Sequence, residues 1–412
     1  MHDQSQSPPA TEAPVPQRLR DFGLFALLAL LSAFIPLSTD MYLPALPTMA
    51  ANLGVPMARA NLTLVLFFVF YSIGTLLWGP LSDKYGRKPI LLIGLTGYVA
   101  ACIACACATN ITQLIIGRVL QALAGGASPA IAVALVKDLF QGPKRERGLV
   151  LIQSMVMLAP IIAPGIGALL LRVTTWHGIF WTLGGFGLVA LLWSLRLRET
   201  VTEPFTGTLV QTWGQLGTVV KNRGFTLLLV TFSLAILPLY AYLASSSYIY
   251  ITEFKQSELV FSAFFMANAA CAVLAPFIYL RLTRAWSRRD IITACIAMLG
   301  ISGVGIMGLG HLKPLALALC IMPATLAMGV IRPPSTHLML EQHRTAAGAV
   351  SSLINFLMSM VGSLGMMLMS AGWRSLILPL GLVHLFAGVV CGGAWLLLAR
   401  QPYIRHVPET RG

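Results

Sequence analysis

The chain has 412 residues, of which 57% are hydrophobic and only 10% are charged. Soluble domains carry about 25% charged residues, so this composition excludes an ordinary soluble enzyme or binding domain and indicates a polytopic membrane protein. The formal net charge of +14 could suit nucleic acid, but most of the 28 Lys and Arg lie in short loops between apolar segments. That distribution is typical of membrane topology, so no nucleic-acid partner is expected.

The first residues, 1–21, are polar and lack the features of a signal peptide, so they are expected to form a disordered cytoplasmic tail. Seven cysteines lie inside apolar segments without the spacing of a metal site or a disulfide framework. No metal site is therefore predicted. No phosphate-binding loop of the ATPase type occurs either, which disfavours a pump driven by ATP hydrolysis in this chain.

A membrane-spanning helix needs about 20 mostly apolar residues. Twelve segments meet this length: 22–45, 61–80, 89–108, 113–136, 148–171, 177–196, 224–246, 259–281, 291–310, 314–336, 347–370 and 375–399. Lys and Arg are concentrated in alternate loops and in the two tails. The positive-inside rule therefore predicts that both termini lie in the cytoplasm.

A polar stretch, residues 197–223, is the longest segment between spans and divides them into two sets of six. It predicts a cytoplasmic linker between an N-terminal bundle, 22–196, and a C-terminal bundle, 224–399, followed by a cytoplasmic tail, 400–412. A basic loop at 84–88 recurs at 281–289, which is a weak internal repeat. The expected fold is an all-α integral membrane protein with twelve transmembrane helices in two six-helix bundles.

The first span ends in the segment 38–47, STDMYLPALP, which places Asp40 within the predicted hydrocarbon region. An ionisable group there is costly, and it indicates a functional site by default. It is the one acidic residue that the pattern places well inside a span. The structural alternative is that Asp40 lies near enough to the outer interface to be hydrated and inert.

The fourth span carries Arg118, Gln121 and Gly125 at i, i+3 and i+7, which places them on one helix face. Asp40 and Arg118 are expected at matching depth, roughly 8 to 11 Å below the outer boundary, where their side chains would interact. Burial favours the neutral carboxyl group, whereas a nearby guanidinium favours the carboxylate, so the pair could act as a proton switch. A static ion pair that fixes helix packing is the alternative.

A cytoplasmic loop follows the second span with the sequence GPLSDKYGRK, residues 79–88. Gly79 and Gly86 permit a tight reversal, Asp83 supplies a carboxylate, and Arg87 supplies a cation at a helix end. An ordinary positive-inside turn would not require these residues at these spacings.

Four segments resemble one known family. Residues 79–88 resemble the loop motif of the major facilitator superfamily, and Arg118 with Gln121 resembles its fourth-helix motif. The segment 159–167, APIIAPGIG, resembles the fifth-helix antiporter motif, with Ala163 where that motif usually has glycine. The segment 38–47 is similar to the first-helix signature of the Bcr/CflA-type multidrug:proton antiporters.

The resemblance implies a transporter, not an enzyme, that exports small amphipathic drugs or toxic compounds in exchange for protons. The proton would be the coupling ion and no other cofactor would be needed. Asp40 would be the proton-coupling acid and Arg118 its partner. The expected substrate-binding residues are Asp40, Arg118, Gln121, Tyr42, Met155 and Tyr240. The expected gating residues are Gly79, Asp83, Gly86, Arg87, Pro160, Pro164, Gly165 and Gly167.

The expected surroundings are the bacterial inner membrane, which the chain would cross several times as a monomer in contact with lipid. The alternative function is proton-coupled uptake or export of a specific metabolite, such as a sugar, an amino acid derivative or a nucleoside. A receptor would need a soluble output domain, and an enzyme would need clustered His, Asp or Glu ligands within the spans. The sequence favours neither.

The second bundle has Leu239 and Leu317 near the positions equivalent to Asp40 and Arg118, so the ionisable chemistry is expected in the first bundle. Arg332, near the end of the tenth span, would either line the cavity or extend to the cytoplasmic interface. Some related antiporters carry a second acid two turns before Asp40. This chain has Ser32 there, which argues against binding of cationic drugs by direct charge pairing.

Overall fold

A computed structural model describes residues 17–201, 216–342, 347–401 and 404. Within these residues the regular elements are all helical, and twelve helical segments are long and apolar enough to cross a membrane. The predicted fold class is confirmed. Most of the predicted N-terminal tail, part of the linker and most of the C-terminal tail lie outside the described residues.

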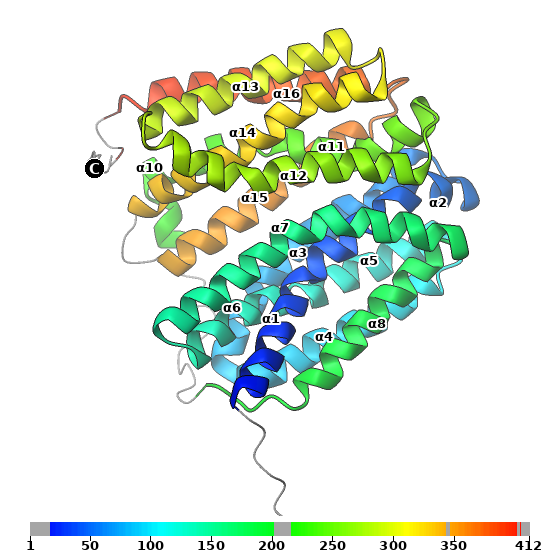
Figure 1. Cartoon of the computed structure of the whole chain (residues 1–412), viewed down its shortest axis with the longest axis vertical. Helices are drawn as coiled ribbons and strands as arrows, with labels where there is room; N and C mark the ends of the chain where they lie inside the picture. The colour runs from blue at the N-terminus through cyan, green and yellow to red at the C-terminus, as the bar shows by residue number, and fades with distance from the viewer. Residues whose placement is uncertain (1–16, 202–215, 343–346, 402–403, 405–412) are drawn as a thin grey trace, which may run out of the picture.

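The first half of the chain forms the lower group of helices in Figure 1. Its elements are α1 (Gln17–Asp40), the 3-10 turn η1 (Leu43–Ala45), α2 (Leu46–Asn52), α3 (Met57–Tyr85), α4 (Arg87–Ala106), α5 (Ile111–Gly125), α6 (Ala127–Leu139), α7 (Gly142–Val173) and α8 (Trp176–Ser194).

The second half forms the upper group. Its elements are α10 (Arg223–Leu234), α11 (Leu237–Ser247), the π-helical turn η2 (Tyr248–Glu253), α12 (Glu258–Leu282), α13 (Arg288–Leu309), α14 (Pro314–Glu341), α15 (Ala347–Met369) and α16 (Ile377–Leu398).

The first span is interrupted directly after Asp40. Pro44 lies at the start of η1 and Pro47 at the start of α2, and proline lacks the N–H group needed to continue a helix. The span nevertheless runs on to Asn52, beyond the predicted end at residue 45. Twelve residues therefore separate Asp40 from that end, more than the sequence predicted.

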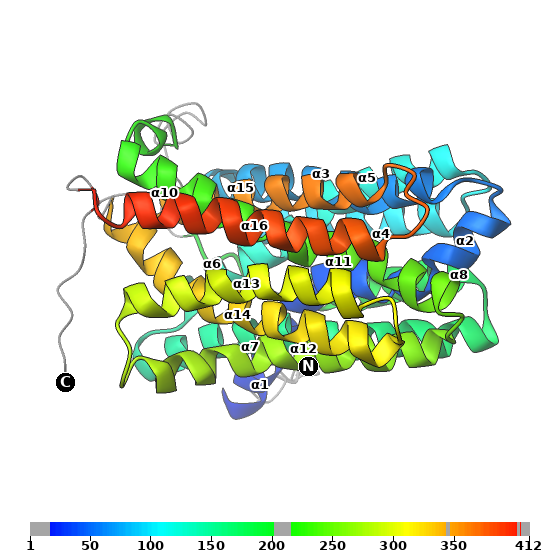
Figure 2. The same ribbon diagram turned by 90° about the horizontal axis from the view of Figure 1, so that it is seen from above.

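An even number of spans places the start of α1 and the end of α16 on one face of the molecule, here called the terminal face. Figure 2 shows α16 running from the opposite face, where α2 lies, to the face where the chain finishes. The prediction of a loop over 79–88 is wrong, because residues 79–85 continue α3 and Arg87 begins α4, so that Gly86 alone connects the two helices at the terminal face.

The two bundles meet along two helix pairs, α3 with α15 and α7 with α12. Near the opposite face, hydrogen bonds join the bundles directly. Asn61 Nδ2 donates to Ser370 Oγ at 3.1 Å, and Ser262 Oγ donates to the Pro164 carbonyl oxygen at 2.9 Å. The bundles are thus held together at the opposite face.

Candidate functional site: a cavity between the two bundles

A cavity of about 750 Å³ lies between the bundles. Residues of α1, α3 and α7 line it from the first bundle, and residues of α11, α12 and α14 line it from the second. The wall is largely apolar and aromatic. Its charged or readily titratable side chains are those of Asp40, Arg332 and His337. A volume of this size is typical of a site for a small organic molecule.

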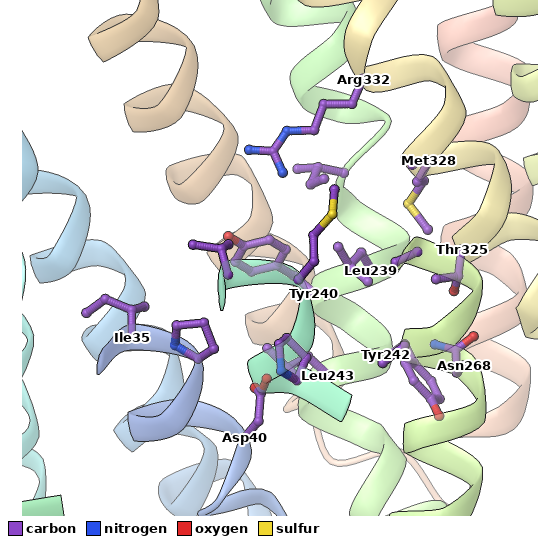
Figure 3. A pocket seen from close by; sticks show the side chains of 18 of the residues that line it. Ile35, Asp40, Leu239, Tyr240, Tyr242, Leu243, Asn268, Thr325, Met328 and Arg332 are labelled. Atoms are coloured by element: carbon purple, nitrogen blue, oxygen red, sulfur yellow. The ribbon is translucent and has the colours of Figure 1, made fainter. Parts of the chain in front are cut away.

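Asp40 is the last residue of α1 and its side chain lines the cavity (Figure 3). The residue is only 5% exposed. Its Oδ1 accepts a hydrogen bond from Thr39 Oγ1 at 2.9 Å, and no ion pair to it occurs among the described residues. A buried carboxylate without a counterion is costly. The site therefore favours a proton, or a donor from a bound molecule, on Asp40.

Arg118 is fully buried on α5. Its Nη1 donates to the Ser38 carbonyl oxygen at 3.0 Å and to Gln121 Oε1 at 2.6 Å. The guanidinium carbon lies 4.1 Å from the centre of the Phe67 ring and within 6 Å of two further rings, those of Tyr42 and Phe180. Aromatic faces attract a desolvated cation, so this cage stabilises a charge that the interior would otherwise reject.

The expected interaction between Asp40 and Arg118 is not present as an ion pair in this conformation. Arg118 contacts the backbone of Ser38 instead. The last carbonyl groups of a helix lack intrahelical donors and attract cations, and α1 ends two residues after Ser38. The backbone at the end of α1 thus takes the place, as acceptor for the guanidinium, that the Asp40 carboxylate was expected to have. Nε and Nη2 of Arg118 have no hydrogen-bond partner in the part of the chain that the structure describes.

The predicted substrate-binding residues divide into two groups. Asp40 and Tyr240 line the cavity. The other four lie outside its lining in this conformation: Arg118, Gln121, Tyr42 and Met155. Gln121 is buried beside Arg118, where its Nε2 donates to Cys102 Sγ at 3.0 Å. The polar stripe on the fourth span therefore faces the interior of the first bundle, because α5 packs between α3 and α4.

Arg332 and Asn268 belong to the second bundle, and both line the cavity. The expectation that the ionisable chemistry is confined to the first bundle is therefore wrong. Of the two alternatives left open for Arg332, the structure shows the cavity-lining one. Its position was hard to read from the sequence because an arginine near a helix end carries the same pattern whether it faces lipid, water or a cavity.

The fifth-helix segment 159–167 lies on α7. Pro160 lines the cavity, and the Pro164 carbonyl joins α12 as described above. Gly167 packs against the backbone of Met41, so closely that a Cβ atom would overlap the Met41 carbonyl oxygen. Gly165, in contrast, has open space where a Cβ atom would lie. Gly167 thus permits the close approach of α7 to the residue that follows Asp40.

The segment 79–88, which comprises the end of α3 and the start of α4, forms a polar cluster at the terminal face. Arg87 makes ion pairs with Asp83, four residues earlier, and with Asp138 at the end of α6, at 3.0 Å from Nε. Its Nη1 also donates to Ser82 Oγ at 2.7 Å. Gly86 has a φ of +100°, a conformation that favours glycine. A Cβ atom on Gly79 would meet nothing within 4 Å.

Glu199, which the sequence did not single out, extends this cluster. Its carboxylate accepts hydrogen bonds from the backbone N–H groups of Arg87, at 2.9 Å, and Lys88, at 3.1 Å. It thereby caps the first turn of α4 from a segment more than a hundred residues away in the chain. Partial burial raises the pKa of Glu199, but the backbone donors lower it, and the net shift is downward.

Two six-helix bundles around a central cavity, with twelve spans, define a secondary transporter of alternating-access architecture. The sequence profile of the Major Facilitator Superfamily matches residues 28–366. The chain therefore belongs to the major facilitator superfamily, a family of transporters and not of enzymes.

Several relatives are similar over different shares of the chain. The uncharacterized MFS-type transporter YdgK of Bacillus subtilis is 29% identical over 389 residues, 92% of this chain and 96% of that protein. The multidrug resistance protein MdtL of Klebsiella pneumoniae is 31% identical over 220 residues, 52% of this chain and 55% of its own length. A bicyclomycin resistance protein homolog of Haemophilus influenzae is 27% identical over 297 residues, 70% of this chain and 73% of that protein.

Solved structures show the same fold at low sequence identity. A D-xylose-proton symporter matches with a TM-score of 0.71 and 13% identity, covering 92% of this chain and 97% of that one. A peptide transporter POT matches with a TM-score of 0.72 and 14% identity, and the match covers 96% of this chain and 97% of that one. These matches establish the fold.

Proposed function

We propose that this transporter exports small amphipathic drugs or toxic compounds in exchange for protons, with Asp40 as the proton-coupling acid. The observation that carries the proposal is the position of Asp40, a buried carboxylate that lines the cavity between the bundles and has no ion-pair partner among the residues that the structure describes. The multidrug and bicyclomycin resistance proteins named above support export of drugs over uptake of a nutrient.

The proposed orientation has the terminal face in the cytoplasm of a bacterium, with the chain embedded in the inner membrane. The basic residues of the segment 79–88 and of the α12 to α13 connection lie on this face, in accordance with the positive-inside rule. The cavity extends toward the terminal face, to His337 and Leu340 near the end of α14, while hydrogen bonds join the bundles at the opposite face. The structure then corresponds to an inward-facing state.

The proposed cycle alternates cargo and proton at Asp40. In the inward-facing state, Asp40 releases its proton and a donor group of the cargo takes its place. The bundles then rock about the central site and open it to the outside. There, a proton displaces the donor from Asp40, and the neutral carboxyl group returns through the closed state at a lower desolvation cost than a carboxylate. Export is thus driven by the inward proton gradient.

The segment 79–88, at the end of α3 and the start of α4, is proposed to act as a gate that holds the helices together at the terminal face in one state of this motion. Arg87 ties the α3 to α4 connection to α6 through Asp138, while Pro160 and Gly167 let α7 bend and pack closely beside α1. Arg118 is proposed to modulate the proton affinity of Asp40 when the bond to the Ser38 carbonyl changes between states.

The test is proton-driven uptake into inverted membrane vesicles, measured with bicyclomycin and a panel of small amphipathic drugs. Wild type is expected to accumulate at least one of these compounds when the vesicle interior is acidic. Asp40→Asn cannot exchange a proton, so it is expected to lose at least 90% of the pH-driven drug accumulation. A tenfold loss of this kind corresponds to roughly 1.4 kcal/mol of coupling free energy. Asp290→Asn, an exposed acid at the start of α13 outside the cavity, is the matched control.

Full pH-driven export by Asp40→Asn at wild-type expression would overturn the role of Asp40. Proton-dependent accumulation of a metabolite in right-side-out vesicles, without export of any drug in the panel, would overturn the proposed direction and cargo.

A further inference from the structure

The charged groups of the cavity lie at separate places along it. Figure 3 shows Asp40 at the bottom of the view and Arg332 at the top, with Tyr240 and Leu243 between them. Asp40 comes from α1 of the first bundle and Arg332 from α14 of the second. A molecule bound between the bundles would therefore meet an acid at one end and a base at the other.

Arg332 presents a permanent positive charge to the cavity, because a guanidinium does not lose its proton in proteins. It forms no ion pair and no side-chain hydrogen bond with the rest of the described chain. The surrounding wall includes the apolar Met328 and Leu239 and the hydroxyl-bearing Tyr240, and Arg332 donates no side-chain hydrogen bond to them. Arg332 is thus available to bind a carboxylate or another strong acceptor of a guest molecule.

The end of the cavity at Asp40 offers an acceptor. Asp40 is only 5% exposed, and its carboxylate accepts a hydrogen bond from Thr39 Oγ1 but makes no ion pair among the described residues. A buried carboxylate without a counterion is costly. A guest with an ammonium, N–H or O–H group at this end would supply a donor and reduce that cost.

The wall between the two ends is apolar and aromatic. Phe68 and Tyr240 lie with their rings 4.8 Å apart in an edge arrangement, and Leu243 completes this stretch of the lining. Such a wall favours a flat, apolar molecular body.

We propose that the preferred cargo is a dipolar amphiphile: a flat apolar body with a donor group bound by Asp40, and an acidic or strongly accepting group bound by Arg332. This inference rests on the proposed function, because it takes the cavity as the cargo site and names the class of molecule that the site selects.

Coupling to protons selects the same class. A simple anion would bind best when Asp40 is neutral, so it would travel together with the proton and not against it. A simple cation would be repelled by Arg332. A dipolar cargo satisfies Arg332 and also competes with the proton at Asp40, which is what exchange requires.

The experiment measures binding of three matched compounds to the purified full-length protein in lipid nanodiscs by calorimetry at pH 8, without a proton gradient. The first probe is aminomethyl-biphenyl-carboxylic acid, with its two groups at opposite para positions. The second is its methyl ester, which lacks the acid, and the third is methyl-biphenyl-carboxylic acid, which lacks the amine. The corresponding single-ring series tests a shorter body.

Wild type is expected to bind the zwitterion about 10- to 100-fold more tightly than either partner compound in at least one series, as a charge-assisted hydrogen bond predicts. Arg332→Gln should abolish the preference for acid over ester while keeping the preference for the amine. Asp40→Asn should do the reverse. Arg284→Gln, an exposed arginine outside the cavity, should change neither preference.

Equal binding of the three compounds by wild type in both series would overturn the inference, and so would an acid preference that survives Arg332→Gln. Arg332→Lys, which keeps the charge, should retain part of that preference if Arg332→Gln fails to fold. The binding assay needs no transport. Proton-driven export without zwitterion preference would therefore overturn this inference alone, and zwitterion preference without proton-driven export would overturn the proposed function alone.

Discussion

Arg118 donates from Nη1 to the carbonyl oxygen of Ser38 at 3.0 Å, and this bond joins α5 to the end of α1 two residues before Asp40. The guanidinium is held by a backbone acceptor and by aromatic rings, while Nε and Nη2 find no acceptor among the described residues. In this conformation the cation is therefore tied to the backbone at the end of α1 and not to the Asp40 carboxylate.

Arg118→Met is predicted to lower both stability and coupling. The substitution removes two unpaired donors, but it also leaves the Ser38 carbonyl oxygen and Gln121 Oε1 without their donor, and an unpaired buried acceptor costs about 1–3 kcal/mol. The thermal unfolding temperature in detergent is expected to fall, and pH-driven export is expected to fall at least tenfold. Arg118→Lys, which keeps the charge but not the guanidinium geometry, is the paired variant. Normal export by Arg118→Met would contradict the coupling role of Arg118.

Gly167→Ala is predicted to impair packing, whereas Gly165→Ala is predicted to be tolerated. A Cβ atom on Gly167 would overlap the Met41 carbonyl oxygen, a backbone atom that cannot move without displacing the end of α1. Overpacking of this kind costs about 1–3 kcal/mol. A Cβ atom on Gly165 would meet nothing within 4 Å. Since alanine is also a better helix former than glycine, Gly165→Ala should not destabilise α7. The measurement is thermal unfolding of both variants with transport at matched expression. Equal effects of the two substitutions would contradict the close-packing role of Gly167.

Glu199 is predicted to stabilise the start of α4 in a pH-dependent way. Partial burial raises its pKa in the folded protein, but the backbone N–H donors of Val201, Arg87, Thr200 and Lys88 together outweigh that effect, so the pKa is lowered. A carboxylate whose pKa is lowered on folding stabilises the folded protein fully at pH values above its unfolded-state pKa, near 4.3. This stabilisation is lost as the pH falls through the lower, folded-state pKa. Since Glu199 is mostly exposed, solvent screening limits the effect to about 0.5–1 kcal/mol.

Hydrogen exchange at the Arg87 and Lys88 amides measures this effect locally. Glu199→Gln should exchange faster than wild type at pH 7, and the difference should shrink below about pH 4, where wild type also loses the charge. An unchanged difference at acidic pH would show that the charge of Glu199 contributes nothing to the cap.

The prediction of twelve spans and two bundles could be made from the sequence because a bilayer imposes a length and an apolar composition on every helix that crosses it. The breaks within spans were harder to place. Span one continues past the prolines that follow Asp40, since residues 43–52 form short helices that bury Leu43, Leu46 and Met49 against the fold. Apolar composition alone does not distinguish such an extension from a loop.

The sequence by itself determined that a carboxylate lies within the first span, because a charge in an apolar segment is visible without any knowledge of its neighbours. Only the tertiary structure decided what that carboxylate meets. Arg118, expected to pair with Asp40, turns to the Ser38 carbonyl, while Arg332 and Asn268 join Asp40 around one cavity from the other bundle. The physical reason is that side-chain partners depend on helix rotation and packing between segments some 200 to 300 residues apart, and a one-dimensional pattern does not encode that rotation.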